Sequence, residues 1–281
     1  MSDPLRILHG PFGRVALLRL DRTMVPHAHR SCHIVFKVGG PDILFGIGQR
    51  EHPITSRYAL LINAWERHFY HHRSDVPTIL LALYLDSEWL KQIDKRFAKS
   101  THPKFFSSPV MEISGRLKQF QGDLLDLIMQ HFVPSGHTVE ELIASVFAEI
   151  MTRMPAPSHL FPLGAHGELG YDARIRHAIE SLLQGGDVAV KVQEIYRTTG
   201  LSRAQFFRLF HRSTGLTPAA FLNMLRLEES IARVSQRDFL LQEVALELGF
   251  DTVGNFTRFF TGQQGIAPSK YRKVVEQIDA H

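Results

Sequence analysis

The stretch "EIYRTTGLSRAQFFRLFHRSTGLTPAAF" at residues 194–221 decides the fold of the second half of the chain, because a second stretch repeats it. The repeat, "EVALELGFDTVGNFTRFFTGQQGIAPSKY", occupies residues 243–271. Each copy has a short apolar helix, a turn with glycine, a second helix and a closing proline. This order is that of a helix-turn-helix motif, whose second helix can lie in the major groove of DNA. The matched pairs are Glu194/Glu243, Gly200/Gly249, Phe206/Phe256, Arg208/Arg258, Phe210/Phe260, Gly215/Gly265 and Pro218/Pro268.

The second helix of each copy has one apolar face and one polar face. The apolar face of each second helix should pack toward the domain interior. Its residues are at positions 206, 209 and 210 in the first copy and 256, 259 and 260 in the second. Arginine can bind guanine, asparagine and glutamine can bind adenine, and apolar groups can cover a thymine methyl. The arginines could instead be ordinary solvated surface, but two copies with charge confined to the second helices favour DNA contact. The candidate DNA-binding residues are Arg203, Gln205, Phe207, Arg208, His211, Arg212, Thr252, Val253, Asn255, Thr257 and Arg258.

These motifs resemble the AraC/XylS family of transcription regulators. The stretch "EVALELGFDTVGNFTRFFTGQQGIAPSKYRK" is similar to the family signature, and "LSRAQFFRLFHRSTGLTPAAFLNMLRLEES" resembles the preceding repeat with its connecting helix. The resemblance spans about residues 172–274. It implies a sequence-specific regulator, such as an activator, with double-stranded promoter DNA and RNA polymerase as partners. It also implies a small-molecule effector and a homodimer.

The first half has a different pattern. Short apolar runs broken by Gly, Pro, Asn and Asp up to about residue 86 predict an antiparallel sandwich or barrel. Helical periodicity follows at 116–131 and 138–153. Residues 154–170 are rich in proline and glycine, which is typical of a linker. We therefore predict an α+β protein in three parts: a cupin-like β-barrel with helices at 1–153 for effector sensing and dimerisation, a linker at 154–171, and an all-α DNA-binding domain with tandem helix-turn-helix units at 172–281.

Histidines cluster in "VPHAHRSCHIVFKVGG" at residues 25–40. His27, His29 and His33 share parity, so on an extended chain they would point to one face of a sheet. The pattern resembles a metal-binding cupin, with His33 in place of the usual glutamate. That resemblance implies His68, on a predicted strand "YALLINAWERHFY" at 58–70, as a fourth ligand. Four imidazoles suit zinc or another divalent transition metal. Contact with a metal-free polar ligand and a purely structural role remain alternatives.

Aromatic side chains lie near His68 in the same predicted strand. Trp65 and Tyr70 could contact a small organic effector, because effector pockets are mostly apolar, or they could belong to the barrel core. Neighbouring positions on a strand alternate between its two faces, so Trp65 and His68 cannot both point inward unless a bulge intervenes. This conflict bears on His68 as the fourth ligand, and Trp65 and Tyr70 are named as candidate effector contacts.

Composition sets the remaining expectations. The 281 residues are 44% hydrophobic and 21% charged, with a formal net charge of +4, which is the composition of a globular protein. Cys32 is the only cysteine, and no apolar run reaches the length of a membrane span, so we expect a cytoplasmic protein with no membrane contact. The leading hypothesis is an effector-controlled transcription regulator that is not an enzyme. The alternatives are a metal-dependent cupin enzyme and a metal-responsive regulator.

Overall fold

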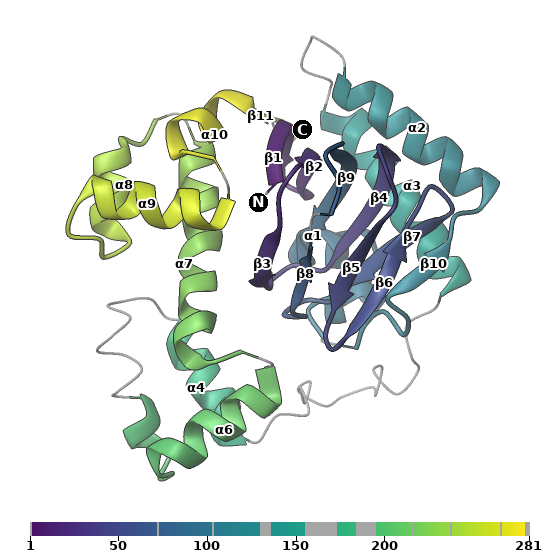
Figure 1. Ribbon diagram of the computed structural model, residues 1–281. Coiled ribbons are helices and arrows are strands. Elements are labelled where there is room, and N and C mark those ends of the chain that lie inside the picture. The colour runs from purple at the N-terminus through teal and green to yellow at the C-terminus, as the bar shows by residue number, and fades with distance from the viewer. Residues whose placement is uncertain are drawn as a thin grey trace.

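The computed structural model describes residues 2–71, 73–102, 104–129, 136–154, 173–183, 195–214, 216–236, 238–264 and 266–278. A strand-rich first half and a helical second half are visible in Figure 1. The predicted linker, apart from Met154, lies outside the described residues, as do Glu194, Gly215 and Gly265 of the repeat. The division of the chain at 153 and 172 therefore stays a prediction. Among the described residues, no helix is both long and apolar enough to cross a membrane.

Strands of the first half, together with β11 from the end of the chain, form two sheets. One has the order β10-β7-β4-β9-β2-β1-β11 and the other the order β3-β8-β5-β6. Neighbouring strands are antiparallel except β1 and β11, which are parallel. The strands are β1 (Ser2–Gly10), β2 (Gly13–Leu20), β3 (Met24–His27), β4 (His33–Gly39), β5 (Ile43–Ile47), β6 (Arg50–Ile54), β7 (Tyr58–Ile62), β8 (His68–Tyr70), β9 (Thr78–Leu85), β10 (Val110–Glu112) and β11 (Val275–Gln277).

The α+β class is confirmed, but the prediction of a closed barrel is wrong. Within the described residues, no backbone pairing joins an edge strand of one sheet to the other sheet. The smaller sheet has short strands, and the register of β3 on β8 is interrupted, so it offers few backbone groups for closure. The two sheets instead pack face to face as an open sandwich. Its interior contains Leu20, Val35, Phe45, Ile62, Tyr70 and Leu80.

Helices cover the other face of the seven-stranded sheet. They are α1 (Ser87–Ile93), α2 (Gly115–Met129) and α3 (Gly136–Arg153). The predicted apolar stripe of α2 is buried at Leu117, Leu124 and Ile128, and these side chains pack in one core with sheet residues such as Leu81. The first half therefore has three layers, with the large sheet in the middle.

Six described helices form the second half: α4 (Ala173–Leu183), α6 (Arg203–Thr214), α7 (Pro218–Ser235), α8 (Leu241–Glu247), α9 (Val253–Gln264) and α10 (Pro268–Val274). The long helix α7 connects the two repeats (Figure 1). Gly200 and Gly249, which match in the repeat, both have positive φ, at 67° and 74°. Glycine adopts this conformation without a steric penalty, which explains why both copies place it in the turn.

The two halves share a strand. β11 pairs with β1 through Ile7 opposite Val275 and Leu8 opposite Glu276. The guanidinium of Arg6 donates from Nη2 to both carboxylate oxygens of Glu276, each at 2.7 Å. The end of the helical half is thereby built into the large sheet, a contact that the sequence patterns did not indicate.

Candidate functional site

The helix α6 presents a polar face to solvent. Arg203, Arg208, His211 and Arg212 are exposed, whereas Phe206 and Phe210 are buried, as predicted. Phe207 is partly buried, with the Arg203 guanidinium 5.5 Å from its ring centroid. Gln205 closes the start of the helix, because its backbone N–H donates to Ser202 Oγ at 3.3 Å while its side chain accepts from the Ser202 N–H at 3.1 Å. Gln205 thus has a structural contact that the sequence reasoning did not assign.

The helix α9 repeats this arrangement with fewer charges. Thr252 Oγ1 accepts a hydrogen bond from the Asn255 backbone N–H at 3.1 Å and so caps the helix. Asn255 Oδ1 accepts from Arg258 Nη1 at 3.4 Å. Thr252, Val253, Asn255 and Arg258 are exposed and Thr257 is partly buried. The candidate DNA-binding residues therefore lie on two outward faces, one in each repeat.

The four predicted histidines lie together at the edge of the sandwich. His27 and His68 are directly opposite each other in the β3–β8 pair, with ring centroids 4.3 Å apart. The ring centroid of His33 is 4.7 Å from that of His68. The ring centroid of His29 is 4.9 Å from that of His27 and 5.3 Å from that of His33. Ring nitrogens of His27, His29 and His68 lie within 4.8 Å of one another.

The path of the chain into this cluster differs from the prediction. His27 and His33 lie on strands of different sheets, so shared parity on one strand is not the cause of their proximity. The single predicted strand 58–70 is also wrong. β7 ends at Ile62, and a turn with Trp65 at φ 64° leads to β8 in the other sheet. The turn is held by Asn63, whose Oδ1 accepts from the Phe106 N–H at 2.7 Å.

Burial determines the protonation of the cluster. The pKa values of His29, His33 and His68 lie well below 6.5, first because burial disfavours the charged form and then because neighbouring histidines repel a second charge. Nε2 of His29 and Nδ1 of His33 are buried and have no hydrogen-bond partner within the described part of the chain. A buried polar atom without a partner costs about 1–3 kcal/mol. His29, His33 and His68 are therefore neutral imidazoles near neutral pH, and one ring nitrogen each of His29 and His33 is left unsatisfied within the described residues.

Ring nitrogens of His29 and His68 have partners among the described residues. Nδ1 of His29 is 2.9 Å from Oε1 of Glu228, which lies on α7. Nδ1 of His68 is 2.9 Å from the carbonyl oxygen of Glu66. Burial raises the pKa of the Glu228 carboxyl, while the nearby Arg14 opposes that effect. The histidine cluster is thus in direct contact with the helix that connects the two repeats.

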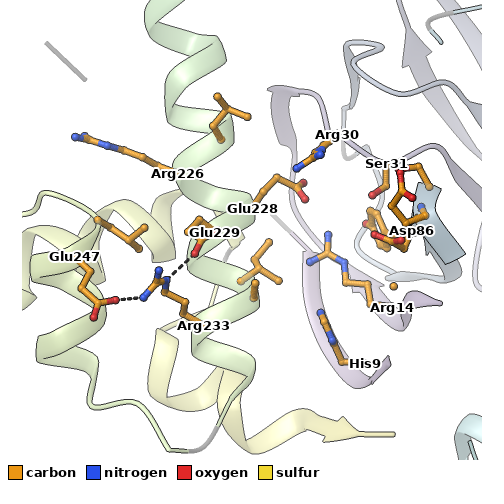
Figure 2. Close-up of a pocket in the computed structure, with 18 of the residues that line it drawn as sticks. His9, Arg14, Arg30, Ser31, Asp86, Arg226, Glu228, Glu229, Arg233 and Glu247 are labelled. Carbon is orange, nitrogen blue, oxygen red and sulfur yellow. Dashed lines mark hydrogen bonds and ion pairs between the residues drawn. The ribbon is translucent and has the colours of Figure 1, made fainter. Parts of the chain in front are cut away.

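A larger cleft of about 710 Å³ lies between the strands β1 and β2 and the helices α7 and α8. Figure 2 shows His9, Arg14 and Arg30 on the strand side, with Glu228 and Arg233 on α7 opposite them. Arg233 forms ion pairs with Glu229 and Glu247. By contrast, the space beside the histidines, which is lined by both sheets and by Gln263 and Gln264 of α9, is about 40 Å³, enough for about one water molecule.

Arg14 has the most unusual environment in the cleft. Its residue is only 8% exposed, its guanidinium stacks 3.9 Å from the Tyr84 ring centroid, and Nη1 donates to Tyr271 Oη at 3.3 Å. No ion pair with a carboxylate is formed by Arg14 among the residues described. The sequence did not indicate a role for Arg14, because Arg14 stands at the start of an ordinary strand pattern. Such a pattern does not show that the helical half packs over the strand.

The predicted effector contacts lie elsewhere. Trp65 stacks on Phe221 of α7, with ring centroids 4.9 Å apart. Tyr70 is fully buried between the two sheets and stacks on Phe45 at 6.0 Å. Neither residue lines the cleft or the small internal space. Their assignment as effector contacts stays a prediction.

Comparisons with known proteins match both halves of the chain. Residues 195–274 match a helix-turn-helix domain family, and residues 18–151 match the family of AraC-like ligand binding domains. The HTH-type transcriptional regulator MtrA of Neisseria gonorrhoeae is 30% identical over 102 residues, which are 36% of this chain and 34% of MtrA. The match thus spans about a third of that relative. The HTH-type transcriptional activator RhaR of Cronobacter sakazakii is 22% identical over 253 residues, 88% of this chain and 86% of RhaR.

The fold is also found among solved structures. The structure of ToxT from Vibrio cholerae superposes with a TM-score of 0.56 at 11% identity, covering 92% of this chain and 97% of ToxT. This likeness concerns the fold, including the order of a sheet-rich half and a helical half. Because a match to the AraC-like ligand binding domain precedes a match to a helix-turn-helix domain in one chain, and its curated relatives are named as HTH-type transcriptional regulators, this chain belongs to the AraC family.

Proposed function

We propose that the protein is a transcription regulator that binds double-stranded promoter DNA through α6 and α9. The observation that carries this proposal is the presence of two exposed polar helix faces, one near each end of the long helix α7. α7 has 18 residues and is therefore about 27 Å long. Successive major grooves on one side of B-DNA are about 34 Å apart, so this spacing suits two helices in adjacent grooves.

The relatives support the same activity. MtrA and RhaR are described as transcriptional regulators, which favours regulation over enzymatic catalysis for this chain. In the proposed regulator, RNA polymerase is a further partner, the faces of α2 and α3 turned away from the sheet pair two copies of the chain, and the protein acts in the cytoplasm.

Selection of binding sequences from a random duplex library with the full-length protein tests the proposal. The expected result is an enriched sequence with two conserved blocks about one helical turn apart, bound far more tightly than its scrambled version. Sequences that are bound without any enrichment, at an affinity that salt alone controls, would contradict sequence-specific regulation.

We further propose that the effector is a small organic acid that enters the cleft between the two halves. The cleft has the size of typical ligand sites, whereas the internal space beside the histidines is too small for an organic molecule. Arg14 lies buried in its wall and has no ion pair with a carboxylate in the part of the chain that the structure describes, and an anionic group of a ligand would supply one. ToxT, which shares the fold, has been solved with a bound unsaturated fatty acid.

A thermal-shift screen of carboxylic acids and phosphate esters tests the effector class. A ligand present at a hundredfold excess over its dissociation constant stabilises the folded protein by about 2.7 kcal/mol. The shift should disappear in Arg14→Gln and persist in Arg57→Gln, a control because Arg57 pairs with Glu112 on the far edge of the sheet. An organic acid that binds equally to Arg14→Gln would place the effector elsewhere.

A further inference from the structure

Four buried or partly buried imidazoles meet at one point, and no role in DNA contact explains them. His27, His29, His33 and His68 come from β3, the following loop, β4 and β8. Four histidine side chains of a structural core would satisfy one another or the backbone. Here Nε2 of His29 and Nδ1 of His33 remain buried without a partner in the described structure. Buried nitrogens without partners, on rings that line one small space, indicate a binding site for a ligand.

The chemistry of the donor set identifies the class of that ligand. Neutral imidazole nitrogens bind zinc, copper, nickel and iron, whereas hard cations such as calcium and magnesium require oxygen ligands. Nitrogens of His27, His29 and His68 lie within 4.8 Å of one another, a separation at which one ion can be shared, and His33 is adjacent. The residues present therefore fit a divalent transition metal.

The outer contacts of the cluster support the same ligand. Metal-binding histidines almost always donate their second ring N–H to a carboxylate or a backbone carbonyl, which fixes the ring and the tautomer. His29 has such a contact from Nδ1 to Glu228, and His68 has one from Nδ1 to the carbonyl of Glu66. Both contacts leave Nε2 for the shared space.

The outer contact of His29 crosses between the two halves of the protein. Glu228 lies on α7, the helix that connects α6 at one end with α8 and α9 at the other. A bound cation draws electron density from the imidazole, so the Nδ1–H of His29 becomes a stronger donor to Glu228. The metal-bound state should therefore hold α7 against the first half more firmly than the metal-free state.

We propose that His27, His29, His33 and His68 bind one divalent transition-metal ion, and that Glu228 transmits the occupancy of this site to the DNA-binding helices. The inference rests on the proposed function, because its output is a change in DNA affinity. It makes the protein responsive to a metal in addition to an organic acid. By linkage, a metal that favours the docked position of α7 changes DNA affinity by the same factor by which DNA changes metal affinity.

Metal content is the first test. The full-length protein is incubated with zinc, desalted, and analysed for bound metal. About one ion per chain is expected, and His29→Ala and His68→Ala should retain none, because the loss of one nitrogen weakens the site strongly. His52→Ala is the matched control, since His52 lies on β6 outside the cluster and should keep the wild-type content. No metal in the wild-type protein, or equal loss in His52→Ala, would overturn the site.

Coupling to α7 is the second test, read out as metal affinity by competition and as DNA affinity with and without zinc. In the wild-type protein, zinc should change the affinity for the selected duplex about 5- to 150-fold. In Glu228→Gln, metal affinity should fall about 10- to 100-fold, and saturating zinc should no longer change DNA affinity. Glu229→Gln is the matched control, because Glu229 pairs with Arg233 and does not contact the histidines. It should keep the full response.

The outcomes separate this inference from the proposed function. If the protein binds its selected duplex but zinc changes nothing in the wild type, the coupling is wrong and the regulator remains. If Glu228→Gln responds to zinc as the wild type does, Glu228 does not transmit the signal. If no form of the protein prefers any duplex sequence while zinc still binds, the proposed function fails and the metal site stands.

Discussion

At the scale of single residues, Arg208 and Arg212 stand one turn apart on the exposed face of α6. Arg208 is nearer the start of the helix, the end that enters the major groove in helix-turn-helix proteins. We predict that Arg208→Ala weakens binding to the selected duplex by about 1–3 kcal/mol and relaxes specificity at one position. Arg212→Ala should lower the affinity for all duplex sequences equally, because the loss of a phosphate contact does not depend on sequence. Titrations on specific and scrambled duplexes at fixed salt decide between them, and unchanged affinity for both would remove Arg208 from the interface.

A second residue-scale prediction concerns acid sensitivity through His9. Burial, and then the charge of Arg14, lower the pKa of His9 from 6.5 to about 4. The unfolded chain therefore binds a proton in this range that the folded chain refuses, so stability falls as the pH drops from about 6.5 towards 4. The contribution is at most about 3 kcal/mol, because His9 is partly exposed. Denaturant unfolding at pH 7.5 and 5 should give a smaller difference for His9→Gln than for the wild type. Equal differences would contradict the low pKa.

The residues of the candidate site were predictable to different degrees. The histidines carry their own signal, because their spacing resembles that of a metal-binding cupin, and the structure places all four together. Arg14 and Glu228 carry no such signal. Each looks ordinary in its own strand or helix, and each acquires its role only where β2 and α7 pack against one another. Contacts between distant segments cannot be derived from local periodicity.

At the scale of elements, the turns of the two helix-turn-helix units make a matched prediction. Gly200 and Gly249 have φ values of 67° and 74°, which side chains with a Cβ rarely adopt. Gly200→Ala and Gly249→Ala should each destabilise the protein by about 1–2 kcal/mol. Gly262 lies within α9 with open space around it, so Gly262→Ala should instead stabilise by up to about 1 kcal/mol. Denaturant unfolding measures all three. If Gly200→Ala leaves the free energy of unfolding unchanged, the turn must be able to relax so that residue 200 adopts a negative φ.

Elements with strong periodicity were predictable, and short ones were not. The runs that became β2, β4, β5, β7 and β9, and the amphipathic stripes of α2 and α3, follow from local patterns. β8 and β11 have three residues each, too few for a period to be visible. The turn at Trp65 was missed for a different reason, because the residues "INAWERH" at 62–68 contain neither glycine nor proline, the two strongest turn signals. The prediction of a barrel was wrong because a barrel closes only when edge strands of the two sheets pair. The alternation of apolar and polar residues along a strand does not show whether they do.

At the scale of the whole molecule, β11 decides how independent the two halves are. The sequence predicts a separate DNA-binding domain at 172–281. In the structure, however, Ile7 and Ala16 of the first half share one apolar cluster with Phe256, Phe260 and Tyr271. The helical half therefore obtains part of its core from the sheet. This shared core, together with the Glu228 contact, gives the first half a physical means of influencing both repeats.

The last prediction tests how far the helical half depends on the sheet, by deleting residues 275–281 from the full-length protein and from the isolated segment 172–281. The isolated segment 172–281 should bind the selected duplex but melt at a lower temperature than the full-length protein, and neither zinc nor organic acids should alter its DNA affinity. Deleting residues 275–281 from the full-length chain should lower its stability, because β1 loses its pairing with β11 and Arg6 loses its ion pair with Glu276.

The same deletion in the isolated segment should matter little, because there the strand has no sheet to join. Thermal unfolding is measured for the full-length protein and the isolated segment, each with and without residues 275–281. The loss of stability on deletion in the full-length protein, minus the loss in the segment, gives the contribution of the contact between the halves, free of any local effect of the deletion. If both deletions cost the same, β11 stabilises only its own helical unit. The regulatory signal would then have to pass through α7 alone.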